Sequence, residues 1–383
     1  MRSRWDAVII GGGLAGAAAA TLLARAGREV VVLERDAGPV DKVCGEFLSH
    51  EAGLYLASLG LDLEALGAVP IEAVRIAHGD RLAATALPFP AWSLSRRVLD
   101  EALLGRAVAA GATLRRGAAV VELACGEEGY RARLEGGAVI NAPAAFLATG
   151  KHDLRGLKRP PGLQNDLLAF KIYYRLAAAQ QRALERHVEL VLFEGGYAGL
   201  QPVEGERANL CLVVRRRRFT ALGRRWESLL AAMRAESPHL AMRLRGAEAC
   251  WPRPLALSVI PYGHVRRRAS GPFRLGDQAA VIPSFSGDGM SIALHSAELA
   301  ARIYLAGGDA EEFQTRLARD VRGQVLLATC LSHALVRRPG QAALSLAARL
   351  APRLVAAVAA HTRVSDAALA RTSLDLAPRP LLP

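Results

Sequence analysis

A glycine-rich turn close to the amino terminus constrains the fold of this chain more than any other feature. The turn has G-x-G-x-x-G spacing, with its glycines at Gly11, Gly13 and Gly16. A short apolar strand is predicted before it, an alanine-rich helix over Leu14–Ala26 after it, and a second apolar strand over Glu29–Glu34. Strand, turn, helix and strand in this order form a βαβ unit with parallel strands. The chain is therefore expected to be an α/β protein that begins with a Rossmann-like layer.

The same spacing suits the pyrophosphate of a dinucleotide. Gly11 permits the tight turn, Gly13 lets the backbone approach the phosphates, and Gly16 lets the helix pack closely on the sheet. The N–H groups at the positive end of the helix dipole then face the phosphates. Glu34 follows Gly13 by 21 residues, where a carboxylate can bind ribose hydroxyls. Arg35 beside it would suit the 2′-phosphate of NADP, but the charge of Glu34 would repel that group.

A second segment, FRLGDQAAVIPSFSGDGM, favours FAD over NAD as the bound dinucleotide. Asp277 follows a short predicted strand and can accept hydrogen bonds from a ribityl chain. The GDGM sequence opens a predicted helix, Met290–Ala306, whose amino-terminal N–H groups can face an isoalloxazine ring. The residues expected to contact FAD at this end are Gly276, Asp277, Pro283, Gly287, Asp288, Gly289 and Met290.

With these motifs the chain resembles the FAD-dependent oxidoreductases of the para-hydroxybenzoate hydroxylase superfamily, and within it the geranylgeranyl-reductase-like branch. The motifs that carry the resemblance lie in the family's order over residues 5–305: GGGLAG with Glu34, KVCGEFLS, SRRVLD, ATG and GDQAAVIPSFSGDGM. The resemblance implies a Rossmann-like FAD-binding domain of the GR2 type, an inserted β-rich substrate domain and a helical C-terminus. The implied boundaries are 1–74, 92–153 and 265–310 for the FAD domain, 75–91 and 154–264 for the substrate domain, and 311–383 for the C-terminal helical region.

The resemblance also assigns candidate residues near the flavin. Cys44 corresponds to a cysteine of the reductase branch and would be a proton donor or a substrate-lining thiol; the alternative is a small buried hydrophobe. Glu46 is the second catalytic candidate and would orient the loop or contact the substrate; the alternative is a solvated loop carboxylate. Arg96, Thr149 and Gly150 are expected to contact the cofactor.

Three further side chains are expected to line the substrate pocket: Tyr197, Tyr262 and His264. Tyr197 begins YAGLQP, which stands where prenyl reductases carry Y-x-W-x-F-P, so that Gly199 and Gln201 replace the tryptophan and the phenylalanine. This smaller and more polar wall predicts a substrate other than an ordinary isoprenoid chain.

The resemblance implies an enzyme that takes electrons from NAD(P)H, bound transiently, and reduces or oxidises a hydrophobic polyketide, quinone or isoprenoid-like molecule. The Asp-Gly pair of aromatic hydroxylases is replaced here by TGKHD at Thr149–Asp153, and the W-x-W-x-I-P motif of halogenases is absent. These departures favour reductase chemistry, while a flavin monooxygenase of aromatic or polyketide substrates stays open. A non-enzymatic lipid carrier of the same fold is the third hypothesis. The presence of Glu34 and Asp277, two residues expected to contact the flavin, argues against it.

Composition limits the partners and the location. The 383 residues carry 49 Lys and Arg against 36 Asp and Glu, so the formal charge of +13 favours anionic partners. Aromatic residues make up 5% and no nucleic-acid module is visible, which argues against nucleic acid. The five scattered cysteines predict neither disulfides nor a metal site and favour the cytoplasm. No sequence feature fixes the oligomeric state.

Two apolar stretches, Ala7–Ala24 and Ala342–Ala360, bear on whether the chain crosses or contacts a membrane. The amino-terminal one is interrupted by Asp6 and three glycines and precedes Arg25, so we expect neither a signal peptide nor a transmembrane helix there. The four arginines Arg215–Arg218 are expected in a solvated turn. Together with the apolar C-terminal helices they leave open a peripheral contact with an anionic membrane surface.

Overall fold

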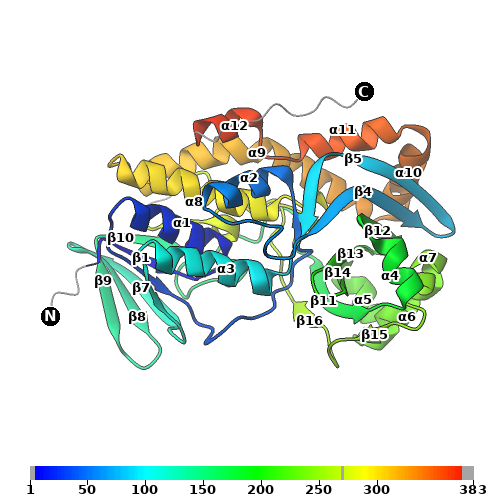
Figure 1. Ribbon diagram of the computed structural model, residues 1–383, viewed down its shortest axis with the longest axis horizontal. Helices are drawn as coiled ribbons and strands as arrows, with labels where there is room; N and C mark the ends of the chain where they lie inside the picture. Colours follow the sequence, from blue (N-terminus) through cyan, green and yellow to red (C-terminus); the bar gives the residue numbers. More distant parts are fainter. Residues whose placement is uncertain (1–4, 269–270, 373–383) are drawn as a thin grey trace.

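A parallel five-stranded sheet forms around the glycine turn in the computed structural model, which describes residues 5–268 and 271–372 (Figure 1). The strand order is β17-β10-β1-β2-β6, with neighbouring strands parallel. The strands are β1 (Ala7–Ile10), β2 (Val30–Leu33), β6 (Thr113–Arg115), β10 (Ala144–Leu147) and β17 (Phe273–Arg274). The predicted βαβ unit and α/β fold class are confirmed, with α1 (Leu14–Arg25) as the crossover helix.

Both faces of this sheet are covered. Ala7 and Ile9 of β1 pack into a core with the helices, whereas Val8 and Ile10 pack against a three-stranded antiparallel sheet. The covering elements are α1 (Leu14–Arg25), α2 (His50–Ser58), α3 (Arg96–Ala109), α8 (Gly289–Leu305) and α9 (Ala310–Leu335) on one face, and β7 (Val120–Gly126), β8 (Gly129–Leu134) and β9 (Val139–Ala142) on the other. Strands covered on two faces are apolar throughout, which is why β1 and β2 are continuous hydrophobic runs.

A mixed nine-stranded sheet forms the other half of the molecule (Figure 1). Its order is β15-β11-β14-β13-β12-β4-β5-β3, and β16 pairs with β11. The strands are β3 (Phe47–Leu48), β4 (Val69–His78), β5 (Arg81–Ser93), β11 (Leu167–Arg175), β12 (His187–Phe193), β13 (Gly196–Val203), β14 (Arg207–Arg215), β15 (Glu248–Ala249) and β16 (Leu255–Leu257). Only β4 and β12 pair in parallel, which is how the 69–93 hairpin joins the strands of 167–257.

Short helices complete this half of the molecule: α4 (Ala178–Leu184), α5 (Arg216–Ala221), α6 (Trp226–Glu236) and α7 (Pro238–Arg243). Leu229, Met233 and Leu240 of α6 and α7 are buried in one core with the apolar side chains of β11 to β14. Of the solvated turn expected at Arg215–Arg218, the solvent exposure is confirmed for Arg216 and Arg217, but the conformation is different. Arg215 ends β14 and the other three begin α5, because side chains of this run find acidic partners, Asp166 for Arg215 and Glu236 for Arg218.

The chain ends in helices α9, α10 (Arg338–Leu350), α11 (Pro352–His361) and α12 (Asp366–Arg371). Helices α10 and α11 pack against the β4–β5 hairpin (Figure 1). The expected C-terminal helical region runs to residue 383, so its last part lies outside the described residues. Within the described residues, no helix combines the length and hydropathy needed to cross a bilayer.

Candidate active site

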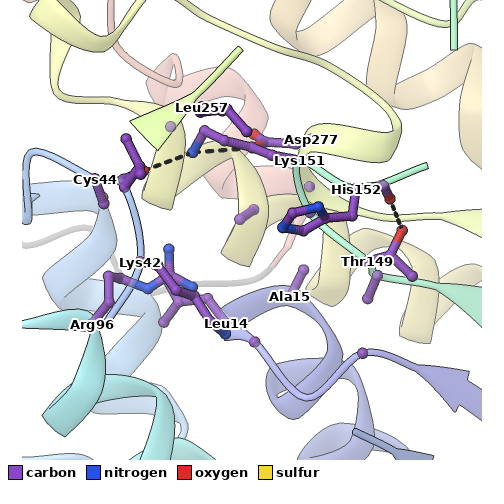
Figure 2. A pocket seen from close by; sticks show the side chains of 18 of the residues that line it. Leu14, Ala15, Lys42, Cys44, Arg96, Thr149, Lys151, His152, Leu257 and Asp277 are labelled. Atoms are coloured by element: carbon purple, nitrogen blue, oxygen red, sulfur yellow. Dashed lines mark hydrogen bonds and ion pairs between the residues drawn. The ribbon is translucent and has the colours of Figure 1, made fainter. Parts of the chain in front are cut away.

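One elongated cavity of about 550 Å³ connects the two glycine motifs. At one end it is lined by Gly11 and Gly13 of the first turn, and at the other by Gly287 and Gly289 before α8. Figure 2 shows side chains from the first turn, from the segment of Cys44 and from the strand-to-loop segment of Thr149 around this space. The segments that meet here are far apart in sequence, because β1, β10 and β17 end at the same edge of the parallel sheet.

Glu34 occupies the end of β2 at the mouth of the first turn. Its Oε2 accepts a hydrogen bond from the Gly12 N–H at 2.6 Å, and its Oε1 accepts one from Asp36 N–H at 3.0 Å. The side chain is buried and lines the cavity, with Arg35 next to it. A carboxylate fixed in this way is suited to hold the ribose of an adenosine.

Two cationic groups lie beside the glycine turn. A Cβ placed on Gly13 would lie 3.4 Å from Arg96 Nη2 and 3.6 Å from Lys42 Nζ. Both cations contact Asp100: Arg96 Nε donates to Oδ1 at 2.8 Å and Lys42 Nζ donates to Oδ2 at 2.8 Å. Burial disfavours the charged carboxylate, but Arg96 and Lys42 outweigh it and lower the pKa of Asp100. Beside Gly13 the two cations therefore exceed the one carboxylate of Asp100 by one positive charge, and together with the amino terminus of α1 this fits a pyrophosphate.

The close approach of α1 to the sheet depends on two of the three glycines. A Cβ on Gly16 would lie 1.9 Å from the Gly11 carbonyl oxygen. A Cβ on Gly11 would lie 2.5 Å from the Ala148 carbonyl oxygen, and Gly11 has φ of +102°. Side chains at these positions would push the helix off the strands, so the backbone geometry of a dinucleotide turn is present here.

The second glycine motif closes the other end of the cavity. Gly276 and Asp277 follow β17, and Asp277 Oδ2 lies 3.5 Å from Lys151 Nζ. Lys151 Nζ also donates to the Val43 carbonyl at 3.3 Å, so that it bridges two walls of the cavity (Figure 2). Asp288 turns away from this space. Its Oδ2 accepts from Gln324 at 3.2 Å, and burial raises its pKa to about 7 although Arg363 opposes the rise.

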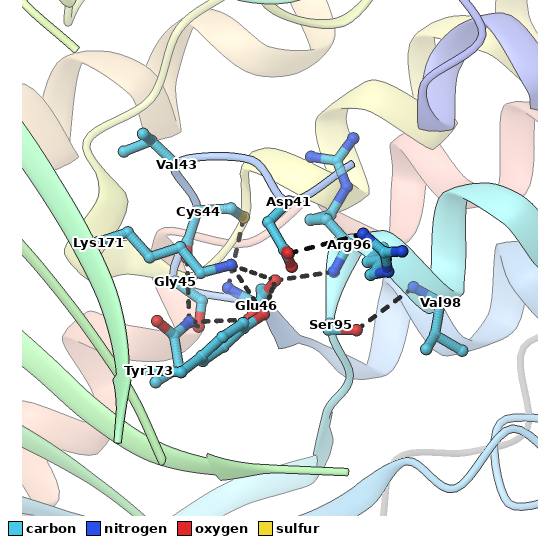
Figure 3. Close-up of polar contacts among 12 residues, drawn as sticks. Asp41, Val43, Cys44, Gly45, Glu46, Ser95, Arg96, Val98, Lys171 and Tyr173 are labelled. Atoms are coloured by element: carbon cyan, nitrogen blue, oxygen red, sulfur yellow. Dashed lines mark hydrogen bonds and ion pairs between the residues drawn. The ribbon is translucent and has the colours of Figure 1, made fainter. Parts of the chain in front are cut away.

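A buried polar network fixes the loop that carries Cys44 (Figure 3). Glu46 has φ of +63° and a buried carboxylate. Lys171 Nζ donates to its Oε1 at 2.5 Å, the Tyr173 hydroxyl donates to its Oε2 at 2.7 Å, and Asn209 Nδ2 donates to Oε2 at 3.0 Å. The same Asn209 amide lies 3.0 Å from the Cys44 carbonyl oxygen. Strands β11 and β14 thereby hold the Cys-Gly-Glu loop against the cavity.

Burial and the neighbouring lysine have opposite effects on the pKa of the carboxylate in this network. Burial raises the pKa of Glu46, and the ammonium of Lys171 opposes the rise. Burial and the neighbouring Glu46 raise the pKa of Tyr173, so its hydroxyl stays protonated and donates. The carboxylate is thus dependent on Lys171 for its charge.

An apolar wall forms the side of the cavity that faces the nine-stranded sheet. Ala169 and Val213 project from β11 and β14, and Leu257 comes from β16. Cys211 lies on this wall too, and burial raises the pKa of its thiol to about 12. The remaining apolar lining here is Ile260, Tyr262, Val281 and Ile282. A hydrophobic molecule can therefore lie against this wall while its other face meets the glycine end.

The structure gathers most of the sequence-predicted residues around this cavity. The ones that line it are Gly11, Gly13, Glu34, Arg35, Cys44, Glu46, Arg96, Thr149, Gly150, Tyr262, Gly276, Asp277, Gly287, Gly289 and Met290. Five others lie outside its described lining. Gly16 packs under the turn, Pro283 precedes a lining residue, and Asp288 faces Gln324. Tyr197 is buried behind the wall with its hydroxyl 3.3 Å from Ser284 Oγ, and His264 lies in a separate basic cluster.

Sequence reasoning did not identify Lys171, Tyr173 or Asn209. The signal for Lys171 was present, since a lysine stands inside the apolar run LLAFKIYYR. A charged residue in a strand buried on both faces needs a buried partner. No described group of three or more His, Cys, Asp or Glu side chains could hold a metal ion.

Comparison with known proteins agrees with this geometry. The FAD binding domain family matches residues 4–139. A menaquinone reductase of Mycolicibacterium smegmatis is 28% identical over 333 residues, which cover 80% of this chain and 78% of that protein. A squalene monooxygenase of Rattus norvegicus is 37% identical over only 87 residues, 22% of this chain and 15% of that protein. Halogenase PltM has a similar structure, with a TM-score of 0.74, 19% identity, and coverage of 86% of this chain and 77% of that one.

The fold and the cavity define an FAD-binding protein with the architecture of the para-hydroxybenzoate hydroxylase superfamily. The chain is an FAD-dependent oxidoreductase. The residues present fit that cofactor: Glu34 would hold the ribose, the Gly13 turn with Arg96 and Lys42 would hold the phosphates, and Gly287 and Gly289 would lie beside the ring.

Proposed function

We propose that this oxidoreductase reduces a hydrophobic quinone or isoprenoid-like molecule with electrons from NAD(P)H. The observation that carries the proposal is the course of the cavity. It runs from the dinucleotide turn to the apolar wall of Ala169, Val213 and Leu257, with Cys44 where the two parts meet. Bound FAD supplies hydride transfer at its isoalloxazine ring.

The protein's own residues are proposed to bind the substrate and to position the proton donor. The wall binds and orients the substrate and excludes water from it. Lys171 and Asn209 hold the loop of Glu46, so that the Cys44 thiol stays at the cavity surface as the proposed proton donor. Glu46 itself makes its hydrogen bonds within the protein and is proposed to position this loop.

Similarity to menaquinone reductases over most of the chain supports reduction, and their name suggests the quinone class. The squalene monooxygenase resemblance covers a much shorter segment. The finer assignment to the geranylgeranyl-reductase-like branch, and the division into FAD, substrate and C-terminal regions given above, belong to this proposal. A monooxygenase remains the second candidate, because flavin-dependent halogenases share the fold.

The test is an anaerobic double-mixing experiment. The FAD-loaded protein is reduced with NADH or NADPH and then mixed with menaquinone in detergent, still without oxygen. Return of the oxidised flavin absorption, with one reduced product per flavin, supports the proposal. If the flavin stays reduced until oxygen enters and the product gains an oxygen atom, the monooxygenase assignment replaces it.

Cys44→Ser tests the proton donor separately, with Cys125→Ser as a control at an exposed cysteine of β7 that does not line the cavity. A positioned proton donor contributes roughly 100-fold or more to a rate. We therefore expect Cys44→Ser to slow flavin reoxidation by menaquinone by about that factor, while flavin reduction by NAD(P)H is unchanged. Equal effects of the two substitutions would exclude Cys44 from this role.

A further inference from the structure

Four basic or imidazole side chains gather at the β17 edge of the five-stranded sheet, outside the cavity. His264 and Arg266 flank Val265, which bridges to Ala280, so both side chains lie on one side of an extended segment. Arg274 ends β17, and Arg159 comes from the loop after β10. These groups interact electrostatically with one another, which places them in one cluster.

The cluster is buried to an unusual degree for cations. Arg274 is 5% exposed, His264 is 6% exposed, and the Arg159 side chain is 3% exposed. Arg266 is partly buried at the rim. Arginine side chains are almost never this buried unless they are paired.

Within this cluster, Arg159 alone has a described hydrogen-bond partner for each of its three guanidinium nitrogens. Its Nε donates to Asp153 at 2.7 Å, and its two terminal nitrogens donate to the carbonyl oxygens of Asp277 and Lys151 at 2.7 and 2.9 Å. Arg274 makes one bond, from Nη1 to the Leu157 carbonyl at 2.9 Å.

Three buried nitrogen atoms of this cluster have no hydrogen-bond partner among the described residues. They are Arg274 Nε, Arg266 Nε and His264 Nε2. An unpaired buried donor costs the full desolvation free energy of the group, and more where the group is charged. Three such atoms within one cluster indicate an acceptor that the described residues do not provide.

The charges of the cluster do not balance either. Arg274 is repelled by Arg266 and Arg159, and among the described residues Asp153 is the carboxylate that offsets them. Burial and the neighbouring arginines lower the pKa of His264 to about 4, so the imidazole is neutral at pH 7 and can donate from one nitrogen. Three guanidinium groups thus face one carboxylate in a region of low solvent access.

We propose that Arg266, Arg274 and His264 form a binding site for a phosphate-type anion. A tetrahedral oxyanion would accept hydrogen bonds from the three unpaired nitrogens and neutralise the excess charge, and arginine is the side chain best suited to such an anion. Arg159 joins this site to the cofactor cavity, because the two residues whose carbonyls it holds, Lys151 and Asp277, line that cavity. The anion is either free phosphate or a phosphate group of the nicotinamide donor; the second source rests on the proposed function.

The first experiment measures anion binding without any turnover. Thermal unfolding and titration calorimetry of the FAD-loaded protein are recorded with inorganic phosphate and with pyrophosphate, at constant ionic strength against chloride. We expect saturable stabilisation of the wild type and at least a tenfold weaker affinity in Arg266→Gln and Arg274→Met. Arg268→Gln is the matched control, since it removes the same charge from an exposed position of the same segment.

A second readout separates a binding site from a purely structural cluster. Because the arginines repel each other, Arg266→Gln should be at least as stable as the wild type in chloride while it loses the response to phosphate. A wild type that shows no saturable response to phosphate or pyrophosphate would overturn the proposal. It would also be overturned if Arg268→Gln lost the response as fully as Arg266→Gln.

Steady-state kinetics then identifies the source of the anion. A tenfold rise of KM for NADPH alone in Arg266→Gln indicates the 2′-phosphate, and an equal rise for NADH and NADPH indicates the pyrophosphate. Unchanged KM values with lost phosphate binding indicate free phosphate. None of these outcomes depends on which substrate reoxidises the flavin, so failure of the proposed function would be seen separately.

Discussion

Replacement of Lys171 by methionine tests the buried network that holds the Cys44 loop. Lys171 and Glu46 are both inaccessible to solvent, with 2.5 Å between Nζ and Oε1. Methionine fills a similar volume and removes the charge, so Glu46 is left buried without its cation. Breaking a buried ion pair from one side costs about 3–5 kcal/mol. Tyr173, Asn209 and the Arg96 N–H still donate to the carboxylate, so we expect about 3 kcal/mol in the free energy of unfolding.

The loss should depend on pH in a defined direction. Burial already raises the pKa of Glu46 above its ordinary value of 4.5, and loss of Lys171 raises it further. Above pH 4.5 the folded variant then retains a proton that the unfolded chain releases, so its stability falls as pH rises. The difference between Lys171→Met and the wild type should be largest above pH 7 and should shrink as pH approaches 5.

The assay is urea unfolding followed by far-ultraviolet circular dichroism at several pH values. The double variant Lys171→Met/Glu46→Gln is the control, because it removes both charges and keeps an amide in place of the carboxylate. We expect it to recover at least half of the lost free energy at pH 8. A loss that is the same at pH 5 and pH 8, and that Glu46→Gln does not relieve, would refute the argument from an unpaired charge.

Three further substitutions, the first with a matched control, test other parts of the account. Gly16→Ala places a Cβ 1.9 Å from the Gly11 carbonyl oxygen and should abolish retention of FAD on a desalting column. The control Gly105→Ala, in open space on α3, should retain FAD and add about 1 kcal/mol to the free energy of unfolding. Although burial opposes ionisation, His239 and Arg243 lower the pKa of Glu189 to about 2, so this carboxylate stabilises the fold above pH 4.5 and less as pH falls toward 2. Arg243→Met should therefore cost about 3 kcal/mol at pH 7 in urea unfolding and little at pH 2. Ala169→Phe should raise KM for menaquinone about tenfold by filling the apolar wall, with an unchanged flavin spectrum; an unchanged KM would place the substrate elsewhere.

The cofactor half of the molecule could be predicted from the sequence because its signals are local. The first turn, its flanking strands and Glu34 lie within one short stretch, and the geometry of a βαβ unit fixes how they meet. The GDGM motif lies far along the chain, but its place at the same sheet edge follows from the strand that precedes it.

The substrate half depends on contacts that no local pattern encodes. The β4–β5 hairpin, Val69–Ser93, has mixed exposure and joins the large sheet through a parallel pairing with β12, more than a hundred residues later. Glu46 was expected near the flavin, but its partners Lys171 and Asn209 come from strands whose register only the folded sheet defines. Tyr197 was placed at the pocket by alignment with a motif, whereas its hydroxyl turns toward Ser284 behind the wall.

A crystal structure of the FAD complex tests the central claim most directly. The account predicts one FAD in the cavity between the two glycine motifs, with a ribose hydroxyl within hydrogen-bond distance of Glu34 and the isoalloxazine ring beside Gly287 and Gly289. A flavin whose ring lies outside this cavity, or whose adenosine does not contact Glu34, would contradict it.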